Sequence, residues 1–173
     1  MTPAEQRTYD TWFAQAQPLL EAHQWTDALK GVPRLEGLEP AAPRPLRTPL
    51  GTATIALVTS AGVSGPDQPP MDGENVEGDY TIRVLDVDTP ADQIAVSHTH
   101  FDTSIARQDL NTVYPVERLR ELAVEGVIGR LAPCAVSFMG YFTNVFRIRD
   151  EVAPAVVAAV QQTGADAALL VPV

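Results

Sequence analysis

A short polar string, Ser97-His98-Thr99-His100-Phe101-Asp102, belongs to the stretch with the densest set of titratable groups in the chain. Two histidines and a carboxylate at this spacing partly match the H-x-H-x-D-H zinc motif of metallo-β-lactamase-like hydrolases. Thr103 stands where that motif has its next histidine, and a catalytic zinc generally uses three protein ligands. Three interpretations of the string therefore stay open. It could hold the metal of a hydrolase, its polar groups could only satisfy hydrogen bonds within a loop, or it could face a substrate.

The single cysteine, Cys134, is the one thiol that this chain could use for redox or nucleophilic chemistry. A lone intracellular cysteine with histidines elsewhere can be a catalytic nucleophile. Cys134 stands at the entry of an apolar run, however, where a free cysteine usually packs as a small hydrophobic residue. The packing interpretation is favoured, because chemistry in parallel sheets collects at the carboxyl ends of the strands.

Alternating strand and helix patterns must position these groups. They predict an α/β fold, with a mostly parallel sheet and flanking helices, of the flavodoxin-like or Rossmann-like kind. The loop 97–111 follows a predicted strand, so we expect it to face a site shared with Thr59 and Val173 at the carboxyl edge of the sheet. Strands are predicted at Thr54–Val58, Tyr80–Val87, Ile94–Val96, Ala135–Met139 and Ala167–Val171. Helices are predicted from Pro115 to Gly126 and at Asp150–Gln162, the latter with Val152, Val156, Val157 and Val160 turned inward.

The first 50 residues differ in pattern from the rest of the chain. Apolar residues between Tyr9 and Leu20 recur at spacings of three and four, which is typical of an amphipathic helix, with Pro18 as a possible kink. A linker follows, with prolines at positions 33, 40, 43, 45 and 49. We therefore divide the chain into residues 1–50, a helical appendage with a proline-rich linker, and residues 51–173, the α/β domain.

Composition limits the partners of this protein. The net charge of −10 and the absence of a basic run exclude a nucleic-acid phosphate backbone as a natural partner. No apolar run approaches the length that spans a bilayer, and the polar start is not a signal peptide. One cysteine excludes an internal disulfide and a cysteine-based zinc cluster. We expect a cytoplasmic protein with no membrane contact.

Six separate strings carry a resemblance to a known family. They are IALVTSAGV (55–63), GDYTIRVLD (78–86), SHTHFDT (97–103), DLNTVYPVERLRELAVEGVIG (109–129), SFMGY (137–141) and the terminal GADAALLVPV. In this order and spacing, they resemble blocks of the selenoprotein B family of glycine, sarcosine, betaine and D-proline reductases. The resemblance covers about Thr52 to Val173 and leaves out the appendage.

The resemblance implies an oxidoreductase subunit that reductively cleaves the C–N bond of an amino acid or amine. In that family the nucleophile is selenocysteine, or cysteine in variants, directly after the block that reads LLVPV here, so this chain would hold no catalytic nucleophile of its own. A pyruvoyl group on a partner subunit activates the substrate amine, and an oligomeric complex is implied. The family blocks also nominate five residues that could line the substrate site, and none as a metal ligand: Thr59, His98, Asp102, Asp109 and Asn111.

Two features of the sequence bear on completeness and substrate. The chain ends beyond an apolar strand without the helix that normally covers such a strand, so we expect truncation at a UGA codon for selenocysteine after Val173. The stretch 105–108 departs from the Asn-Arg that the family commonly has there, which leaves the substrate open. A non-catalytic α/β binding protein is a further alternative.

Overall fold

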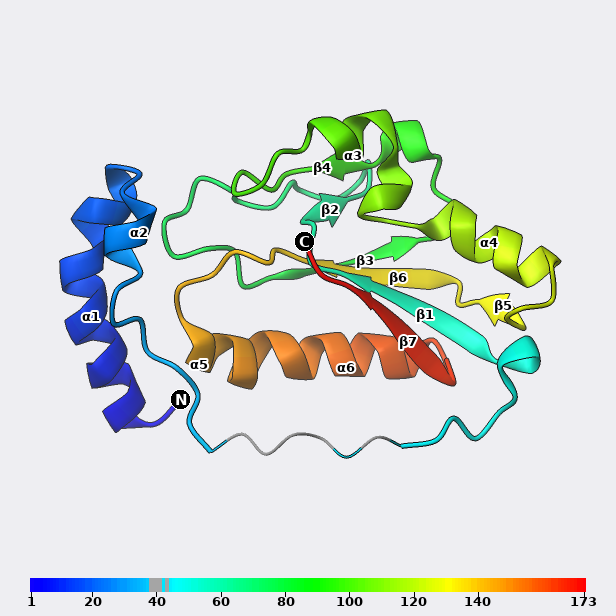
Figure 1. Ribbon diagram of the computed structural model, residues 1–173, viewed down its shortest axis with the longest axis horizontal. Coiled ribbons are helices and arrows are strands. Elements are labelled where there is room, and N and C mark those ends of the chain that lie inside the picture. Colours follow the sequence, from blue (N-terminus) through cyan, green and yellow to red (C-terminus); the bar gives the residue numbers. More distant parts are fainter. Residues whose placement is uncertain (38–41, 43) are drawn as a thin grey trace.

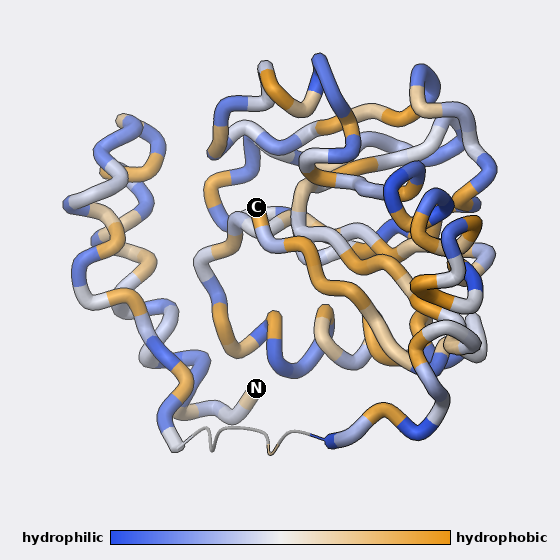
Figure 2. Tube along the Cα trace, turned by 45° about the vertical axis from the view of Figure 1, so that its right-hand side comes forward, coloured by the Kyte–Doolittle hydropathy of each residue, from blue (hydrophilic) through white to orange (hydrophobic). Residues whose placement is uncertain are grey.

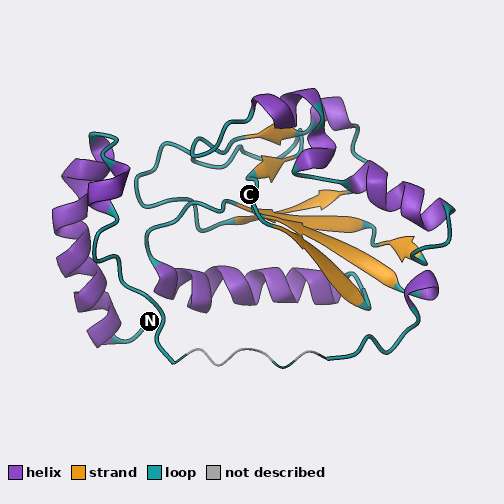
Figure 3. Ribbon diagram, in the orientation of Figure 1, coloured by secondary structure: helices purple, strands orange, loops and turns teal. Residues whose placement is uncertain are grey.

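The computed structural model describes residues 1–37, 42 and 44–173. A five-stranded sheet lies between two layers of helices, and the N-terminal helices stand to one side of it (Figures 1 and 3). The predicted α/β class, the mostly parallel sheet and the N-terminal helix are confirmed. The described parts of the linker 31–49 hold neither helix nor strand before Pro49, and Pro40 and Pro43 lie outside the described residues.

The sheet is built around β1 (Thr54–Thr59), whose six residues are all buried. On one side of β1 run β5 (Arg130–Leu131) and β6 (Cys134–Phe138), and on the other runs β7 (Ala167–Val171), all parallel to it. The register with β1 changes by two residues between β5, where Ile55 pairs with Leu131, and β6, where Val58 pairs with Val136. Pro133 lies between the two strands and lacks the amide hydrogen that a continuous ladder needs. The antiparallel strand β3 (Ile82–Asp86) lies outside β6.

One face of the sheet is covered by α3 (Ser104–Gln108) and α4 (Val116–Val124), and the other by α5 (Val145–Arg147) and α6 (Ala153–Gln162) (Figure 1). Successive residues of β1 serve the two faces in turn, as the pleat requires. Leu57 belongs to the cluster that includes Leu119 of α4, whereas Val58 belongs to the cluster that includes Ala159 of α6. Both clusters therefore depend on β1.

The α6 layer corrects one prediction from the sequence. Helical turns already begin at Val145, capped by Asn144, and a π-helical turn over Ile148–Val152 joins α5 to α6. The wide turn lies just before Pro154, which cannot donate the hydrogen bond of a regular α-helical turn. Val157 was predicted to point inward, but 54% of it is exposed. The reason is that no described strand lies outside β7 to cover it.

The predicted strand at Ile94–Val96 is also corrected in place and length. β4 (Ala95–Val96) pairs antiparallel with β2 (Val63–Ser64) in a separate two-stranded sheet above the main one (Figure 3). The amide of Ser97 donates to the carbonyl of Gly62 at 3.1 Å and extends this pairing. The pairing of β4 with β2, which follows Gly62, holds the loop after β4 beside the end of β1.

The N-terminal segment is a helical pair, α1 (Pro3–Glu21) and α2 (Trp25–Ala28). The α1 helix starts with a capping box between Thr2 and Glu5, and its apolar stripe forms a small core that includes Trp12, Leu20 and Phe146. This core is separate from the two clusters of the sheet. The division at residue 50 stays a prediction.

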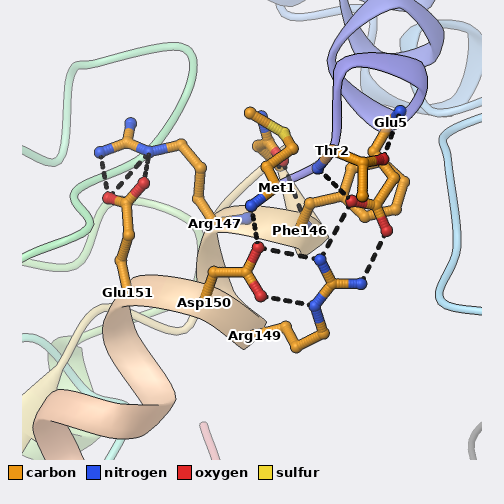
Figure 4. Close-up of polar contacts among 9 residues, drawn as sticks. Met1, Thr2, Glu5, Phe146, Arg147, Arg149, Asp150 and Glu151 are labelled. Carbon is orange, nitrogen blue, oxygen red and sulfur yellow. Dashed lines mark hydrogen bonds and ion pairs between the residues drawn. The ribbon is translucent and has the colours of Figure 1, made fainter.

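Polar contacts also hold the start of α1 against the turn before α6 (Figure 4). Arg149 makes two hydrogen bonds to Glu5, at 2.7 and 3.1 Å, and a third and fourth to Asp150. The amino group of Met1 pairs with the Asp150 carboxylate. These partners are largely at the surface, so the contacts orient α1 more than they stabilise the fold.

Candidate functional site

Three parallel strands end side by side at the carboxyl edge of the sheet, and Ser60 ties their ends together. Its amide donates to the carbonyl of Val171 at 3.1 Å, and its carbonyl accepts from the amide of Gly140 at 2.8 Å. Its hydroxyl accepts from the amide of Val173 at 2.9 Å. The residues that follow β1, β6 and β7 therefore meet at one place, which we call the carboxyl-edge site.

Small residues allow this close meeting. A methyl group added at Gly140 would lie 3.1 Å from both the Ser60 hydroxyl oxygen and the Val173 carbonyl oxygen, tighter than most real contacts. Gly62 has a φ of +66°, a conformation that side chains disfavour, and it turns the chain from β1 into β2. A side chain at Gly140 would push these strand ends apart.

Thr59 lies at this edge, but its side chain has a structural contact. It is fully buried, and its hydroxyl donates to the carbonyl of Val113 at 2.7 Å. This bond ties the segment before α4 to the end of β1. Thr59 therefore has a structural role. The neighbouring Ser60 carries the strand-end contacts, and the sequence did not indicate it, because its partners Gly140, Val171 and Val173 are far away along the chain.

His98 lies beside Gly62 at the same edge and is 6% exposed. Burial, and after it the nearby His100, lowers the pKa of His98 to about 4, so the imidazole is neutral at pH 7. Its Nδ1 accepts a hydrogen bond from the backbone amide of His100 at 3.1 Å, which assigns the proton to Nε2. Nε2 has no partner among the described residues. His98 thus holds a buried, unused N–H donor.

The side chains of His100 and Asp102 make their main contacts with other partners. His100 stacks on Tyr141, with ring centroids 3.5 Å apart and planes 6° from parallel. Asp102 is exposed and accepts from the amide of Ser104 at 2.9 Å at the start of α3, and this hydrogen bond lowers the pKa of Asp102. No three His, Cys, Asp or Glu side chains gather for a metal in residues 1–37, 42 and 44–173. The geometry gives the hydrolase alternative no support.

Asp109 and Asn111 line a different cavity, of about 330 Å³, together with Tyr114 and Arg120. Asp109 accepts from the backbone amide and the side-chain amide of Asn111, at 2.9 and 3.0 Å. Burial raises the pKa of Tyr114, whose hydroxyl has no partner in the described part of the chain. This cavity adjoins Val87, whose amide bonds to the carbonyl of Pro133 just before β6. The structure therefore separates the five predicted site residues. Thr59 and His98 lie at the carboxyl edge and Asp109 and Asn111 line this cavity, whereas Asp102 is exposed at the start of α3.

Cys134 is the first residue of β6 and is partly buried. It pairs with Asp86 at the amino end of the strand, whereas Phe138 at the other end leads to the carboxyl-edge site. Its position fits the packing interpretation that the sequence favoured.

Comparison with known proteins identifies the class to which this α/β fold belongs. The family described as glycine/sarcosine/betaine reductase selenoprotein B matches residues 20–173, and the chain belongs to this family. The match starts earlier than the expected Thr52, so it includes the end of α1 and all of α2. No solved structure matches the chain.

Curated relatives carry names from the same group of reductases. The D-proline reductase subunit gamma of Acetoanaerobium sticklandii is 34% identical over 76% of this chain and 54% of its own length. The glycine reductase complex component B subunit gamma of Carboxydothermus hydrogenoformans is 34% identical over 74% of this chain and 30% of its own length. The sarcosine reductase complex component B subunit beta of Peptoclostridium acidaminophilum is 33% identical over 60% of this chain. The chain thus spans about half the length of the first of these relatives and less of the others.

No helix in the described part of the chain is long and apolar enough to cross a membrane.

Proposed function

We propose that this chain is a subunit, or part of a subunit, of a reductase that cleaves the C–N bond of an amino acid or amine. The substrate would belong to the glycine, sarcosine, betaine or D-proline class. Family membership supports the reductase assignment, and the names of the family and of the relatives supply the range of substrates. Those names also describe components of complexes, which supports a partner subunit and an oligomeric assembly. We further propose a cytoplasmic location.

The observation that carries the proposal is the meeting of strand ends at Ser60. Ligands and reacting groups of parallel α/β sheets collect beyond the carboxyl ends of the strands. Val173 lies at this edge against Ser60 and Gly140. A selenocysteine or cysteine directly after Val173 would enter the carboxyl-edge site from β7. A selenol there would be ionised at neutral pH and could displace nitrogen from the α-carbon of the substrate.

The residues of this chain would bind and orient the substrate. The Nε2–H of His98 would donate to a substrate carboxylate, because a buried donor without a partner costs free energy that such an acceptor would recover. Ser60 and Gly140 would hold the strand ends in close contact, so that a residue directly after Val173 is presented at this edge. A pyruvoyl group on a partner subunit would activate the substrate amine when bound.

Reading the gene beyond the Val173 codon tests the proposal most directly. We expect UGA or a cysteine codon, followed by an in-frame α/β segment. A different stop codon with no open frame downstream would contradict the catalytic proposal and favour a non-catalytic binding protein.

Activity supplies the second test. The full product of the gene, combined with the reductase subunits encoded beside it and a dithiol, should release amine or ammonia from one of glycine, sarcosine or betaine, or open the ring of D-proline. The matched control replaces the selenocysteine or cysteine with alanine and should release none. Equal turnover by this control would refute the assigned nucleophile.

A further inference from the structure

A second cavity lies where the N-terminal helices meet the α/β part of the chain. It has a volume of about 1000 Å³ and is bounded by the end of α1, by α2, by the loops 73–76 and 99–101 and by Tyr141. Its wall includes Glu21, Trp25, Glu74, His100 and Tyr141. We call it the aromatic cavity. None of the five site residues nominated from the sequence lines it.

Three rings form a corner in this wall. The stacked rings of His100 and Tyr141 present one plane. Trp25 stands nearly perpendicular to both, with interplanar angles of 77° to His100 and 79° to Tyr141 and centroid distances of 4.9 and 5.8 Å. The faces of aromatic rings carry negative electrostatic potential and attract organic cations. A corner of two perpendicular planes offers such a cation two faces at once.

The charged groups of the wall have one sign. Glu21 and Glu74 contribute carboxylates, and no lysine or arginine is among the described residues that line the cavity. Burial lowers the pKa of His100, with Glu74 opposing and His23 assisting the shift, so the His100 ring is neutral at pH 7. The cavity therefore favours a cation and disfavours an anion.

The loop that carries Glu74 is held in place before any ligand arrives. The Thr99 hydroxyl donates to the carbonyl of Gly73 at 2.6 Å, and the Tyr141 hydroxyl donates to the carbonyl of Val76 at 2.9 Å. A methyl group added at Gly73 would lie 2.5 Å from the carbonyl oxygen of Ser97, so only glycine permits this approach. The backbone that carries Glu74 is thus fixed relative to the rings, which reduces the entropy lost on binding.

We propose that the aromatic cavity binds an alkylated ammonium group, such as the N-methylated or quaternary amine of a small molecule. Methyl groups on nitrogen weaken its hydration and pack on ring faces, so an alkylated ammonium loses less hydration than a primary ammonium when it enters a cavity lined by rings. The binding itself does not depend on the reductase activity. Only a role of the cavity in choosing an N-methylated substrate over glycine rests on the proposed function.

Calorimetric titration of the full 173-residue chain tests the binding with three probes. Choline should bind saturably. Its neutral carbon isostere, in which a tertiary butyl group replaces trimethylammonium, should bind about tenfold more weakly, because it keeps the shape and loses the charge. Glycine should give no saturable heat at the same concentrations. Equal affinity for choline and its isostere would overturn the cationic assignment, and so would the absence of saturable choline binding to folded protein.

Variants locate the site. Trp25→Leu and Glu74→Gln should each weaken choline binding several-fold. Glu74 is on an exposed loop, so its amide variant should keep the fold, which a melting curve checks. The matched control is Glu125→Gln, an exposed glutamate at the end of α4 that does not line the cavity. Choline affinity that is unchanged in both Trp25→Leu and Glu74→Gln, or lowered equally in Glu125→Gln, would place binding elsewhere and refute the inference. Activity is not measured, so failure here leaves the proposed function standing.

Discussion

The neighbouring strands β1 and β7 have similar compositions and opposite environments. Both are short and rich in aliphatic residues, and they pair in parallel over five positions from Ile55–Ala167 to Thr59–Val171. Every residue of β1 is buried, whereas Leu170 of β7 is 67% exposed. Figure 2 shows the apolar stretch of β7 running from near the C-terminus along the margin of the sheet.

The difference comes from neighbours and not from the strands themselves. The β1 strand has strands on both sides and helices on both faces, but no described strand pairs with the outer edge of β7. An apolar groove of about 410 Å³ runs beside β7 and is lined by Leu170, Val156 and Phe138, among others. The apolar composition of a strand therefore indicates that it can be buried, but its position in the sheet decides whether it is buried.

The largest effect should come from truncating one leucine in each of the two strands. Leu57→Ala empties a fully buried position and should lower the free energy of unfolding by about 2–5 kcal/mol. Leu170→Ala removes an exposed side chain and should change it by less than about 0.5 kcal/mol. Urea denaturation of both variants measures the two values. If Leu170→Ala destabilises the protein as much as Leu57→Ala, then β7 is covered in solution and the comparison fails.

The next effect concerns His98, a titratable residue that is buried beside the end of β1. Its folded-state pKa of about 4 lies below the reference value of 6.5, so the unfolded chain takes up the proton first. Its contribution is thus fully present above pH 6.5 and falls by on the order of 3 kcal/mol as the pH decreases to 4.

The unfolding free energy of wild type minus that of His98→Gln, followed from pH 7 to pH 4, isolates this group from the carboxylates. The difference should shrink on acidification. A difference that stays constant would mean that His98 is not buried as described.

A smaller effect on stability, but a clear one on association, is expected from charging β7. Leu170→Lys should lower self-association, because a lysine on an apolar edge strand opposes pairing with another chain. Val124→Lys is the matched control, since Val124 is a 90% exposed aliphatic residue on α4. Sedimentation velocity over a range of concentrations compares them. Equal association of Leu170→Lys and wild type would show that β7 does not drive self-association.

The smallest effect should come from the opposite margin of the molecule, where α1 meets the turn before α6 (Figure 4). Arg149→Gln removes the ion pairs with Glu5 and Asp150. Exposed pairs contribute little, so the global melt should hardly move. Proteolysis within the linker 31–49 should become moderately faster, because α1 is held less firmly. A large loss of global stability would show that α1 belongs to the main core.

The sequence predicted the elements with local signals well. Residues Ala167–Val171 form β7 as expected, and Gly126 follows α4 with a φ of +73°, which suits a glycine after a helix end. The predicted carboxyl edge brings together the ends of β1 and β7. Predictions failed where contacts with other elements decide whether a side chain is buried, as at Val157. They also failed where a two-residue strand gave no sign of the sheet to which it belongs, as at Ala95–Val96.

The sequence by itself determined the α/β class, the strand and helix order and the resemblance to the reductase family, because these follow from local periodicity and from strings of neighbouring residues. Only the tertiary structure decided which side chains meet. It placed His98 beside Gly62, sent Asn111 to another cavity and brought Trp25 together with Tyr141, which lies far along the chain. Such meetings depend on strand register and helix docking. Those are set by burial summed over the whole domain, and no local pattern records them.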